Sequence, residues 1–441
     1  MSIGTFLIII SSITLIFSLF SMFNVLGKNM LLTMPGIFYI YFIIFIFLGS
    51  PIYFINQGAI NIYYIVAVHL VLIILPLSIS LTNKLMLIEF KGIFNTYLSA
   101  PIIDKQDNNH FILPFILVLF VTLIVTFLYY LNLDIIPINF LLSNLNNGIE
   151  INELGKLRES ATTSFKLGKL HRYNIFMVQL LPLLVIVAFL KSKITESNIW
   201  KSVFIILTLM TIYRCISDLQ KGPIVEFIIL LFLAAWIYNG KINWRQVVFL
   251  IISIMSVLSM MYYYIMGINH ETFIKLIYII CKRIFITQTS ALYYYFSLFP
   301  SSHEFLYGTS LPNPAGIFQF ENFPLTKWIF VNGMYRNSQV VGSANSAFVG
   351  EIYANYGFPI MLVTVIIFSM ILQFIQIKFI SKERTLLLTA FYIYFVSMSS
   401  QFAFTGLFVV AHLYLFIFLI TAIILVDGYK ILYGACSQNE Q

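Results

Sequence analysis

Long apolar runs separated by short polar connections follow one another along the whole chain. A hydrocarbon core of about 30 Å needs about 20 consecutive apolar residues in a helix. The pattern therefore predicts an all-α polytopic membrane protein with about eleven transmembrane helices, which form a single integral membrane domain over 1–441. The expected spans are 3–24, 36–55, 61–81, 111–132, 174–190, 198–216, 224–239, 247–268, 358–377, 385–403 and 407–426.

The composition agrees with a membrane location. Of the 441 residues, 60% are hydrophobic and 10% are charged, whereas soluble domains carry roughly a quarter charged residues. The net charge of +8 comes mostly from Lys and Arg in the short connections between apolar runs. We interpret it as a topology signal and not as a nucleic-acid-binding surface.

The basic residues fall in alternate connections, which predicts the orientation of the chain. Short loops rich in Lys and Arg face the cytoplasm. The alternation then places a smaller loop, 133–173, and a large loop, 269–357, on the periplasmic face of a bacterial inner membrane. The connections with basic residues are the first loop with Lys28, then 82–110, 191–201, 240–246 and 378–384, and the tail with Lys430.

The large loop 269–357 is the most informative segment, because it is partly polar in a chain that is otherwise apolar. A protein that only filled a bilayer would have no use for it. Chemistry on a polar substrate carried by a lipid would need such a loop at the membrane surface. In the smaller loop, 144–172 is expected to be either an amphipathic helix on the outer surface or a solvated connector.

Arg214, Asp218 and Lys221 form the first candidate group, at the outer end of the span 198–216. A charge in an apolar context is costly and points to a function. If the helix continues past Asp218, the three side chains share one face and form a site with net positive charge. The alternative is an Arg214–Asp218 pair that neutralises itself. Glu226 follows in the first turn of the next span, where the helix dipole favours an acid.

Lys282 and Arg283 open the second candidate group and precede the aromatic stretch Tyr293–Phe296. Such a segment suits a helix at the membrane interface, with aromatic side chains at headgroup depth. Arg283 is then placed to bind a phosphate through its guanidinium fork. The alternative is that both cations only anchor the helix at the headgroups.

The end of the large loop combines small residues with an acid. Ser346, Gly350 and Ala354 recur at helical spacing and predict a face for close helix contact, with Glu351 and Asn355 on another face. A carboxylate at the membrane rim, partly removed from water, is suited to act as a general base. The alternative is a helix cap with an incidental acid. The coil between the second and third groups adds His303, Glu304, Glu321, Lys327 and Arg336.

Several familiar kinds of site are missing from the sequence. It has no Asp-x-Asp pair outside the expected spans, no HExxH motif, no Walker loop and no GxSxG motif. The three cysteines have no metal-ligand spacing, and we interpret them as packing residues. The remaining inventory is Arg and Lys for phosphate, Glu or His for protons, and aromatic residues for sugar rings. It suits transfer from a lipid diphosphate without a metal.

Four local patterns add to the overall topology: Arg214…Asp218-x-x-Lys221-Gly222-Pro223; Lys282-Arg283 followed by Tyr293–Tyr295 and Phe299-Pro300; Tyr307–Leu311; and Gly350–Gly357. With these patterns, the chain resembles the bacterial O-antigen polymerases of the Wzy type, which polymerise oligosaccharide repeat units. The resemblance covers most of the chain as topology. The His-Asn pair of the related O-antigen ligases is not seen, since Ala344-Asn345 stands at the similar place.

The resemblance implies a metal-independent glycosyltransferase of the membrane-embedded GT-C kind, with no cofactor. It would join undecaprenyl-diphosphate-linked oligosaccharide units on the periplasmic face into O-antigen or a related surface polysaccharide. The growing chain would pass from its lipid carrier to a sugar hydroxyl of a new unit, releasing undecaprenyl diphosphate. The expected partners are this lipid-linked substrate, the bilayer and a chain-length regulator protein, with no nucleic acid.

Two tasks dominate such a reaction. Arg214 and Arg283 would stabilise the leaving diphosphate. Glu351 would take the proton of the acceptor hydroxyl, with Glu321 and His303 as the next candidates. The expected substrate-binding residues are Lys221, Lys282, Asp218, Glu321, His303, Arg336, Asn345 and Tyr353.

Three other functions fit parts of the pattern. A flippase for the same lipid-linked oligosaccharides would distribute charges through a central cavity and show internal pseudo-symmetry, whereas here the polar residues gather in one loop. A structural component of an export complex would need no clustered Arg, Lys and Glu. An O-acyltransferase would want a membrane-embedded His beside a polar partner, and neither His69 nor His412 has an evident one.

Overall fold

The computed structural model describes residues 3–57, 61–104, 108–143, 173, 175–265, 273–313, 316–335 and 342–407. Within these ranges the chain is helical and contains no strand; the one isolated pairing of extended backbone joins Ile103 and Thr385. The predicted all-α class is therefore confirmed. The α-helices are α1 (Ile3–Leu26), α2 (Met34–Phe42), α3 (Ser50–Gln57), α4 (Ile62–Leu85), α5 (Phe90–Ser99), α6 (Asn108–Leu131), α7 (Pro137–Ser143), α10 (Leu181–Thr195), α11 (Asn198–Ser217), α12 (Lys221–Asn239), α13 (Trp244–Ile265), α14 (Phe273–Phe285), α15 (Thr287–Leu298), α16 (Leu325–Ile329), α17 (Phe348–Ile380) and α18 (Leu386–Ser399).

Helices long and apolar enough to cross a membrane recur along the described chain. Nine such helices are present in the described ranges, and the apolar part of α6, Phe115–Leu131, is a shorter one. Together they correspond to the first ten predicted spans. The eleventh, 407–426, lies outside the described residues apart from Leu407, and so does the segment 144–172. The chain is thus a multi-pass membrane protein.

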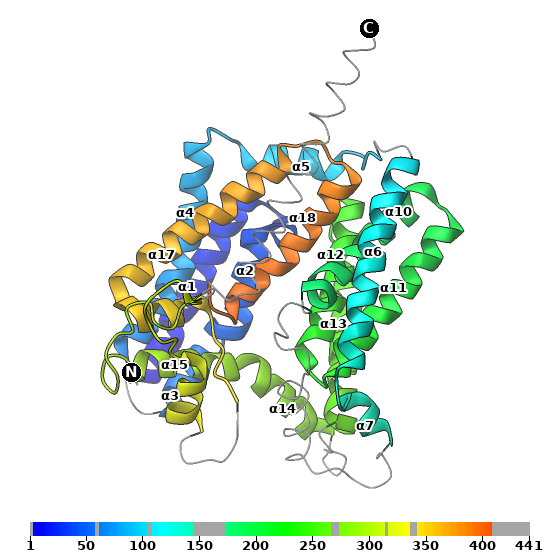
Figure 1. Cartoon of the computed structure of the whole chain (residues 1–441). Coiled ribbons are helices and arrows are strands. Elements are labelled where there is room, and N and C mark those ends of the chain that lie inside the picture. The colour runs from blue at the N-terminus through cyan, green and yellow to red at the C-terminus, as the bar shows by residue number, and fades with distance from the viewer. Residues whose placement is uncertain are drawn as a thin grey trace.

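The connections that carry the basic residues meet at one end of the helix bundle, which we call the basic end (Figure 1). There α5 and the turn 381–385 between α17 and α18 lie together. The Arg384 guanidinium joins them, because it donates to Leu98 O at 2.9 Å and to Ala100 O at 2.6 Å. It also donates to Ile237 O near the end of α12. One buried cation therefore binds the last carbonyls of two helices, where a helix dipole favours positive charge.

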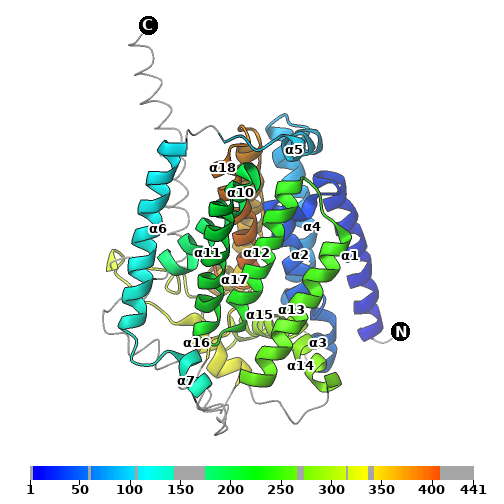
Figure 2. The same cartoon turned by 90° about the vertical axis from the view of Figure 1, so that its right-hand side faces the viewer.

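Three short helices, α7, α14 and α15, lie at the opposite end of the bundle, which we call the far end (Figures 1 and 2). The large loop 269–357 is thus not a simple connection. It contains α14, α15 and α16, and α17 begins inside it at Phe348, ten residues before the predicted span 358–377. Gly357 interrupts α17 with a φ of 79°, a conformation that glycine adopts without a steric penalty. The predicted start of the span is therefore a kink within a longer helix.

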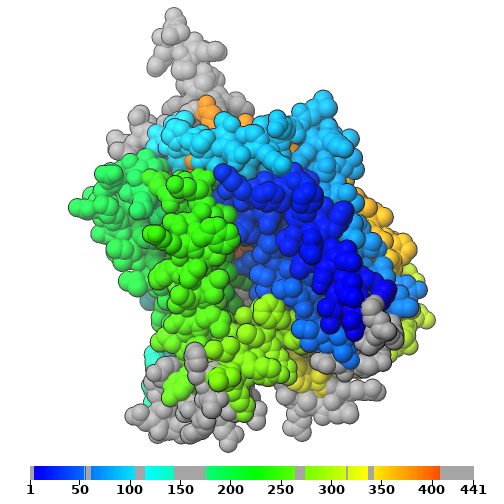
Figure 3. All heavy atoms as spheres, turned by 180° about the vertical axis from the view of Figure 1, so that it is seen from behind, coloured from blue at the N-terminus to red at the C-terminus, as the bar shows by residue number. Residues whose placement is uncertain are grey.

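The helices divide into a central and an outer set. The side chains of α2, α10 and α18 are mostly buried, whereas α1, α11 and α13 expose large apolar side chains, as helices that face lipid do. Figure 3 shows the green surface of α13 bordering the blue surface of the N-terminal helices. α18 contacts α2 as well as α10 and α12, so it joins the N-terminal helices to the middle of the chain.

The α-helical part of α18 ends four residues before the end of the predicted span 385–403. It ends at Ser399, a 3₁₀ turn (Ser400–Ala403) follows, and Phe404–Leu407 are not helical. We call Ser400–Leu407 the 400–407 segment. Irregular backbone among apolar helices needs partners for its polar groups, and such breaks often mark binding sites. The 3₁₀ turn packs against α2.

α15 packs tightly against the first turns of α17. A Cβ atom at Gly350 would lie 2.9 Å from Leu292 Cδ1 and 3.0 Å from Tyr295 Cγ, so only glycine allows this approach. Ser346 Oγ donates to Gln288 O at 3.3 Å on the same side. The predicted close helix contact is therefore confirmed at Gly350, whereas Ser346 contacts α15 from the backbone just before α17 begins at Phe348.

Candidate functional site

Arg214 and Asp218 form an ion pair at the far end of α11, with 3.3 Å between Arg214 Nη1 and Asp218 Oδ2. The condition for a shared face with Lys221 is not met, because α11 ends at Ser217 and Leu219 takes a left-handed φ of 55°. Lys221, Gly222 and Pro223 then begin α12 instead of forming a separate turn. Arg214 is buried and its Nε atom has no hydrogen-bond partner, so part of its donor capacity is unused.

Lys221 and Arg283 converge on one aromatic ring. Lys221 Nζ lies 3.5 Å from the centre of the Tyr262 ring in α13, which is a cation–π contact. Arg283, in the last turn of α14, interacts electrostatically with the hydroxyl of the same tyrosine. Lys282 and Arg283 are both exposed. The end of the bundle opposite the basic end thus carries cations from α12 and α14, and we call Lys221, Lys282 and Arg283 the far-end cations.

Glu351 lies in the first turn of α17, and its carboxylate turns toward the 400–407 segment instead of the outer rim. Glu351 Oε2 accepts a hydrogen bond from the backbone N–H of Leu407 at 2.9 Å. A Cβ atom at Gly406 would lie 2.3 Å from the same oxygen, so the absence of a side chain at Gly406 makes room for the acid. The predicted position at the outer membrane rim is therefore corrected: the segment after α18 covers this carboxylate.

Tyr295 of α15 completes the surroundings of Glu351. Burial raises the pKa of the Tyr295 hydroxyl, and the nearby Glu351 charge raises it further. This hydroxyl donates to Ala344 O at 3.0 Å, so it is neutral and fixed in place. Among the described residues no Lys or Arg forms an ion pair with Glu351. A carboxylate without a cationic partner in an apolar setting is suited to accept a proton.

A second acid approaches the other end of the same segment. Glu226, in the second turn of α12, accepts a hydrogen bond from Gln401 Nε2 at 3.2 Å. The hydroxyl of Tyr41 in α2 lies near both Glu226 and Ser400. From the sequence alone, Glu226 was connected only with the helix dipole, and Gln401 was not predicted as a site residue. A charge within an apolar span was the signal that could have identified Glu226 as a functional residue.

The 400–407 segment therefore holds two carboxylates, one near each of its ends. Leu407 follows Gln401 by six positions, which limits the distance between their Cα atoms to roughly 20 Å even in a fully extended chain. The ring of Phe404 lies between them in sequence and contacts Tyr41 and Phe45, with centroid distances of 5.9 and 5.6 Å. An aromatic cluster and two acids are thus assembled around one irregular stretch of backbone.

The remaining predicted residues lie apart from this arrangement. His303 packs among Phe299, Phe323 and Trp328, and its Nδ1 atom pairs with Glu304 O at 2.7 Å. Tyr353 is buried, stacks on Phe296 with centroids 4.0 Å apart, and donates to Phe299 O. The other three predicted residues divide into two kinds: Glu321 and Asn345 are exposed, and Arg336 lies outside the described residues.

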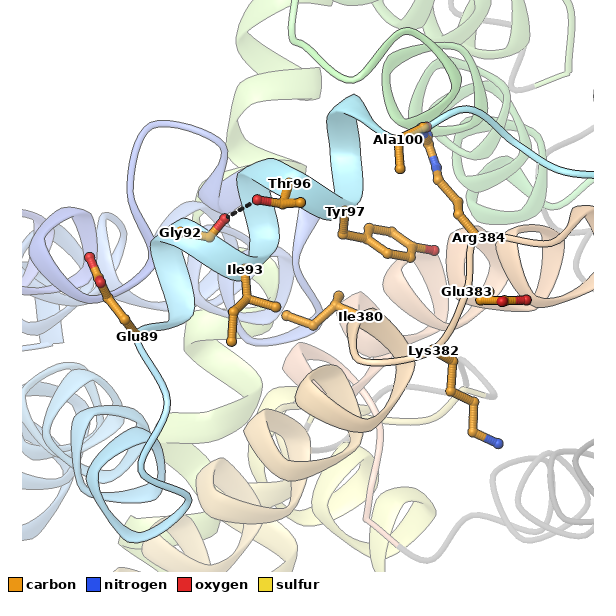
Figure 4. A pocket seen from close by; sticks show the side chains of 10 residues that line it. All are labelled: Glu89, Gly92, Ile93, Thr96, Tyr97, Ala100, Ile380, Lys382, Glu383 and Arg384. Atoms are coloured by element: carbon orange, nitrogen blue, oxygen red, sulfur yellow. Dashed lines mark hydrogen bonds between the residues drawn. The ribbon is translucent and has the colours of Figure 1, made fainter.

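A pocket of about 470 Å³ lies at the basic end, between α5 and the turn 381–385. Figure 4 shows the Tyr97 ring beneath α5 and the Arg384 side chain extending toward Ala100. Arg384 is engaged with the backbone carbonyls described above, and its guanidinium carbon lies 5.5 Å from the centre of the Tyr97 ring. The pocket is therefore a feature of the junction of α5, the end of α17 and the turn 381–385, at the opposite end of the bundle from the far-end cations.

Across the described ranges, no three His, Cys, Asp or Glu side chains are grouped as metal ligands would be. Cys215 and Cys281 are free thiols, and Cys436 lies outside the described residues. Comparison of the chain with protein-family models, curated proteins and solved structures gives no match. Any function must therefore be argued from the far-end cations, the two acids and the 400–407 segment.

Proposed function

We propose that this multi-pass membrane protein is a glycosyltransferase of the GT-C kind that polymerises undecaprenyl-diphosphate-linked oligosaccharide repeat units. The observation that carries the proposal is the position of Glu351. Its carboxylate lies between α15 and the 400–407 segment, and among the described residues it accepts a hydrogen bond only from the backbone N–H of Leu407. An acid held in this way is available as a proton acceptor.

The proposed reaction is a substitution at the anomeric carbon of the growing chain. The hydroxyl oxygen of the acceptor sugar forms the new glycosidic bond as the bond from the anomeric carbon to the diphosphate breaks. The electron pair of the broken bond leaves with undecaprenyl diphosphate, and the hydroxyl proton passes to the Glu351 carboxylate. No metal or cofactor is needed for this balance, provided that cations stabilise the leaving group.

The far-end cations supply that stabilisation in the proposal. Arg283 is exposed at the end of α14, and Lys221 lies over the Tyr262 ring, so both charges are at the surface where a lipid headgroup arrives. Arg214 contributes less net charge, because Asp218 partly neutralises it. The diphosphate would lie beside α12 and α14, with the attached sugar extending toward the 400–407 segment.

The distribution of basic residues gives the orientation in the proposal. The basic end would face the cytoplasm of a bacterial inner membrane, because Lys and Arg in short connections mark the cytoplasmic side. The far end, with α14, α15 and the far-end cations, would then face the periplasm. A chain-length regulator protein remains a further expected partner on that side.

A flippase for the same lipid-linked oligosaccharides is the second candidate. The observation that favours it is the irregular backbone after α18 next to Glu226, because non-helical backbone and acids among spanning helices are found at the binding sites of transporters. Both candidates act on the same substrate class, so they are separated by what accumulates when the protein is absent.

Deletion of the gene, followed by gel electrophoresis of surface lipopolysaccharide, separates the two functions. Loss of the polymerase is expected to leave lipid core that carries a single repeat unit. Loss of a flippase leaves bare core, because no repeat unit reaches the periplasm. A normal ladder of polymer lengths after deletion would contradict both candidates.

Arg283→Ala is expected to lower the rate of sugar transfer about 10²–10³-fold, since a lost charge-stabilising donor costs roughly 2.7–4 kcal/mol in the transition state. Arg283→Lys keeps the charge but not the guanidinium fork, and should retain an intermediate rate. The measurement is incorporation of labelled repeat units by membranes that contain each variant. Arg245→Ala, an exposed cation at the start of α13 on the basic end, is the matched control. Full-length polysaccharide made by Arg283→Ala would remove Arg283 from the mechanism.

A further inference from the structure

Glu226 is a half-buried acid for which the proposed reaction has no step. The leaving diphosphate needs cations, and a single base, Glu351, suffices for the acceptor proton. A carboxylate among apolar helices costs stability unless its oxygens are satisfied. The position of Glu226 on α12, facing the 400–407 segment, therefore requires a purpose of its own.

The immediate surroundings of Glu226 are a hydrogen-bonding set on three elements. Gln401 donates one amide N–H to Glu226 Oε2 at 3.2 Å. The Tyr41 hydroxyl of α2 lies near Glu226 and Ser400, and the Tyr394 hydroxyl of α18 also interacts with the acid electrostatically. Acid, amide and phenol thus come together from α12, α2 and the end of α18.

The hydrogen bonds within this set do not fill all acceptor positions of the Glu226 carboxylate. A carboxylate accepts about four hydrogen bonds, whereas within the described residues Glu226 accepts one, from the Gln401 amide. Glu226, Gln401 and Tyr41 each keep part of their surface accessible, although all three lie within the apolar length of the bundle. The remaining acceptor positions of Glu226 are therefore available to hydroxyl groups from outside the chain.

A purely structural role for Glu226 explains neither its position in α12 nor the presence of an acid there. As a helix-dipole partner, Glu226 would lie in the first turn of α12, but it stands five residues after Lys221, at which the helix begins; the dipole effect falls off within that first turn. As a clamp on the 400–407 segment, an amide would serve as well as an acid, without the desolvation cost of a charge.

We propose that Glu226 and Gln401 form the binding subsite for the acceptor sugar and present its hydroxyl to Glu351. The inference rests on the proposed glycosyltransferase function and assigns the acceptor side of the same site. A carboxylate accepts from two adjacent sugar hydroxyls, and the Gln401 amide supplies both a donor and an acceptor. The exposed parts of the Tyr41 and Phe404 rings, 5.9 Å apart between centroids, offer an apolar surface for the C–H face of the sugar.

Because the 400–407 segment contacts both acids, the subsite and the base are part of one structural unit. Gln401 fixes Glu226, and Leu407 fixes Glu351. An acceptor bound at Glu226 would be oriented relative to the base by the same backbone. Positioning of this kind lowers the entropic cost of bringing hydroxyl and base together.

The test uses purified full-length protein, a lipid-linked repeat unit as donor at fixed concentration, and the same oligosaccharide on an alkyl chain as acceptor. The alkyl glycoside has no diphosphate and therefore cannot act as a donor. Glu226→Gln should raise the KM for this acceptor about tenfold to a hundredfold, with kcat within about threefold of the wild type. Glu304→Gln, an exposed acid in the far-end coil, is the matched control and should change neither value.

A reciprocal exchange distinguishes an acceptor subsite from an internal clamp. The double variant Glu226→Gln/Gln401→Glu keeps a carboxylate–amide pair but moves the charge from α12 to the 400–407 segment. The raised acceptor KM should persist in the double variant if the sugar needs the acid on α12. An unchanged KM in Glu226→Gln, or a wild-type KM in the double variant, would overturn the subsite. A wild-type protein without transfer activity would instead refute the underlying function, so the two failures are separable.

Discussion

Glu351→Gln is expected to reduce sugar transfer about 10²–10⁴-fold, the usual contribution of a positioned general base. Glutamine has the same shape, and its carbonyl oxygen can still accept the hydrogen bond from the Leu407 N–H that Glu351 Oε2 accepts at 2.9 Å. The local structure is therefore retained while the proton acceptor is lost. The measurement is turnover of lipid-linked repeat units by purified protein, together with the polymer ladder in cells.

Two further variants sharpen this prediction. Gly406→Ala leaves every titratable group in place, but its Cβ atom would lie 2.3 Å from Glu351 Oε2 and must displace the carboxylate. We expect it to lower turnover as well, because the base is moved from its position. Glu304→Gln again serves as the exposed control. Turnover of Glu351→Gln above about a tenth of the wild-type value would exclude Glu351 as the base and would favour a role as a helix cap.

Local patterns predicted the helices well, because a helix is set by residues close in sequence. Apolar runs gave ten of the predicted spans, and the small residue Gly350 identified the point where α17 packs on α15. The Arg214–Asp218 pair is likewise a contact four residues apart. It forms even though the helix ends between the two residues, since the C-cap position still lies one turn after Arg214.

The candidate site could not be predicted in the same way, because its contacts join distant parts of the chain. Glu351 meets Leu407 across 56 residues, and Glu226 meets Gln401 across 175. The sequence showed an apolar run ending near residue 403, but not that the backbone after it would turn toward two acids. Periodicity carries no information about such contacts, which depend on how the helices pack.

The far-end cations show a second limit of local patterns. Lys221 was expected to share a helix face with Arg214, but the two residues lie on different helices, and Lys221 packs on Tyr262 of α13 instead. A left-handed residue, Leu219, ends the earlier helix, and non-glycine residues in that conformation are hard to foresee from composition. The cations nevertheless gather at one end of the bundle, because α11, α12, α13 and α14 all begin or end there.

The two acids and the cations differ in how the protein surrounds them, and this difference matches their proposed roles. Lys282 and Arg283 are exposed, as groups that capture a headgroup diphosphate must be. Glu226 and Glu351 are held by an amide and a backbone N–H inside the bundle. The charges proposed to bind the diphosphate thus lie at the surface, whereas the acids proposed to bind and to deprotonate the acceptor lie inside the bundle, where a lower dielectric constant strengthens electrostatic interactions.

Asp104→Ala is expected to destabilise the protein by about 3–5 kcal/mol, the cost of leaving one member of a buried ion pair without its partner. Asp104 pairs with Lys191 near the basic end, and the Lys191 side chain is 0% exposed. The ammonium group would lose its ion-pair partner while remaining buried. The measurement is the denaturant or thermal unfolding of purified protein in detergent.

The double variant Asp104→Ala/Lys191→Met should recover most of the loss, because an apolar side chain of similar length needs no counter-charge. Lys193→Ala, which removes an exposed cation from the same helix, should have little effect. If Asp104→Ala is as stable as the wild type, other groups neutralise Lys191 and the prediction is wrong. If the free energy of unfolding falls in Asp104→Ala and is restored in the double variant, the buried charge is the cause of the loss.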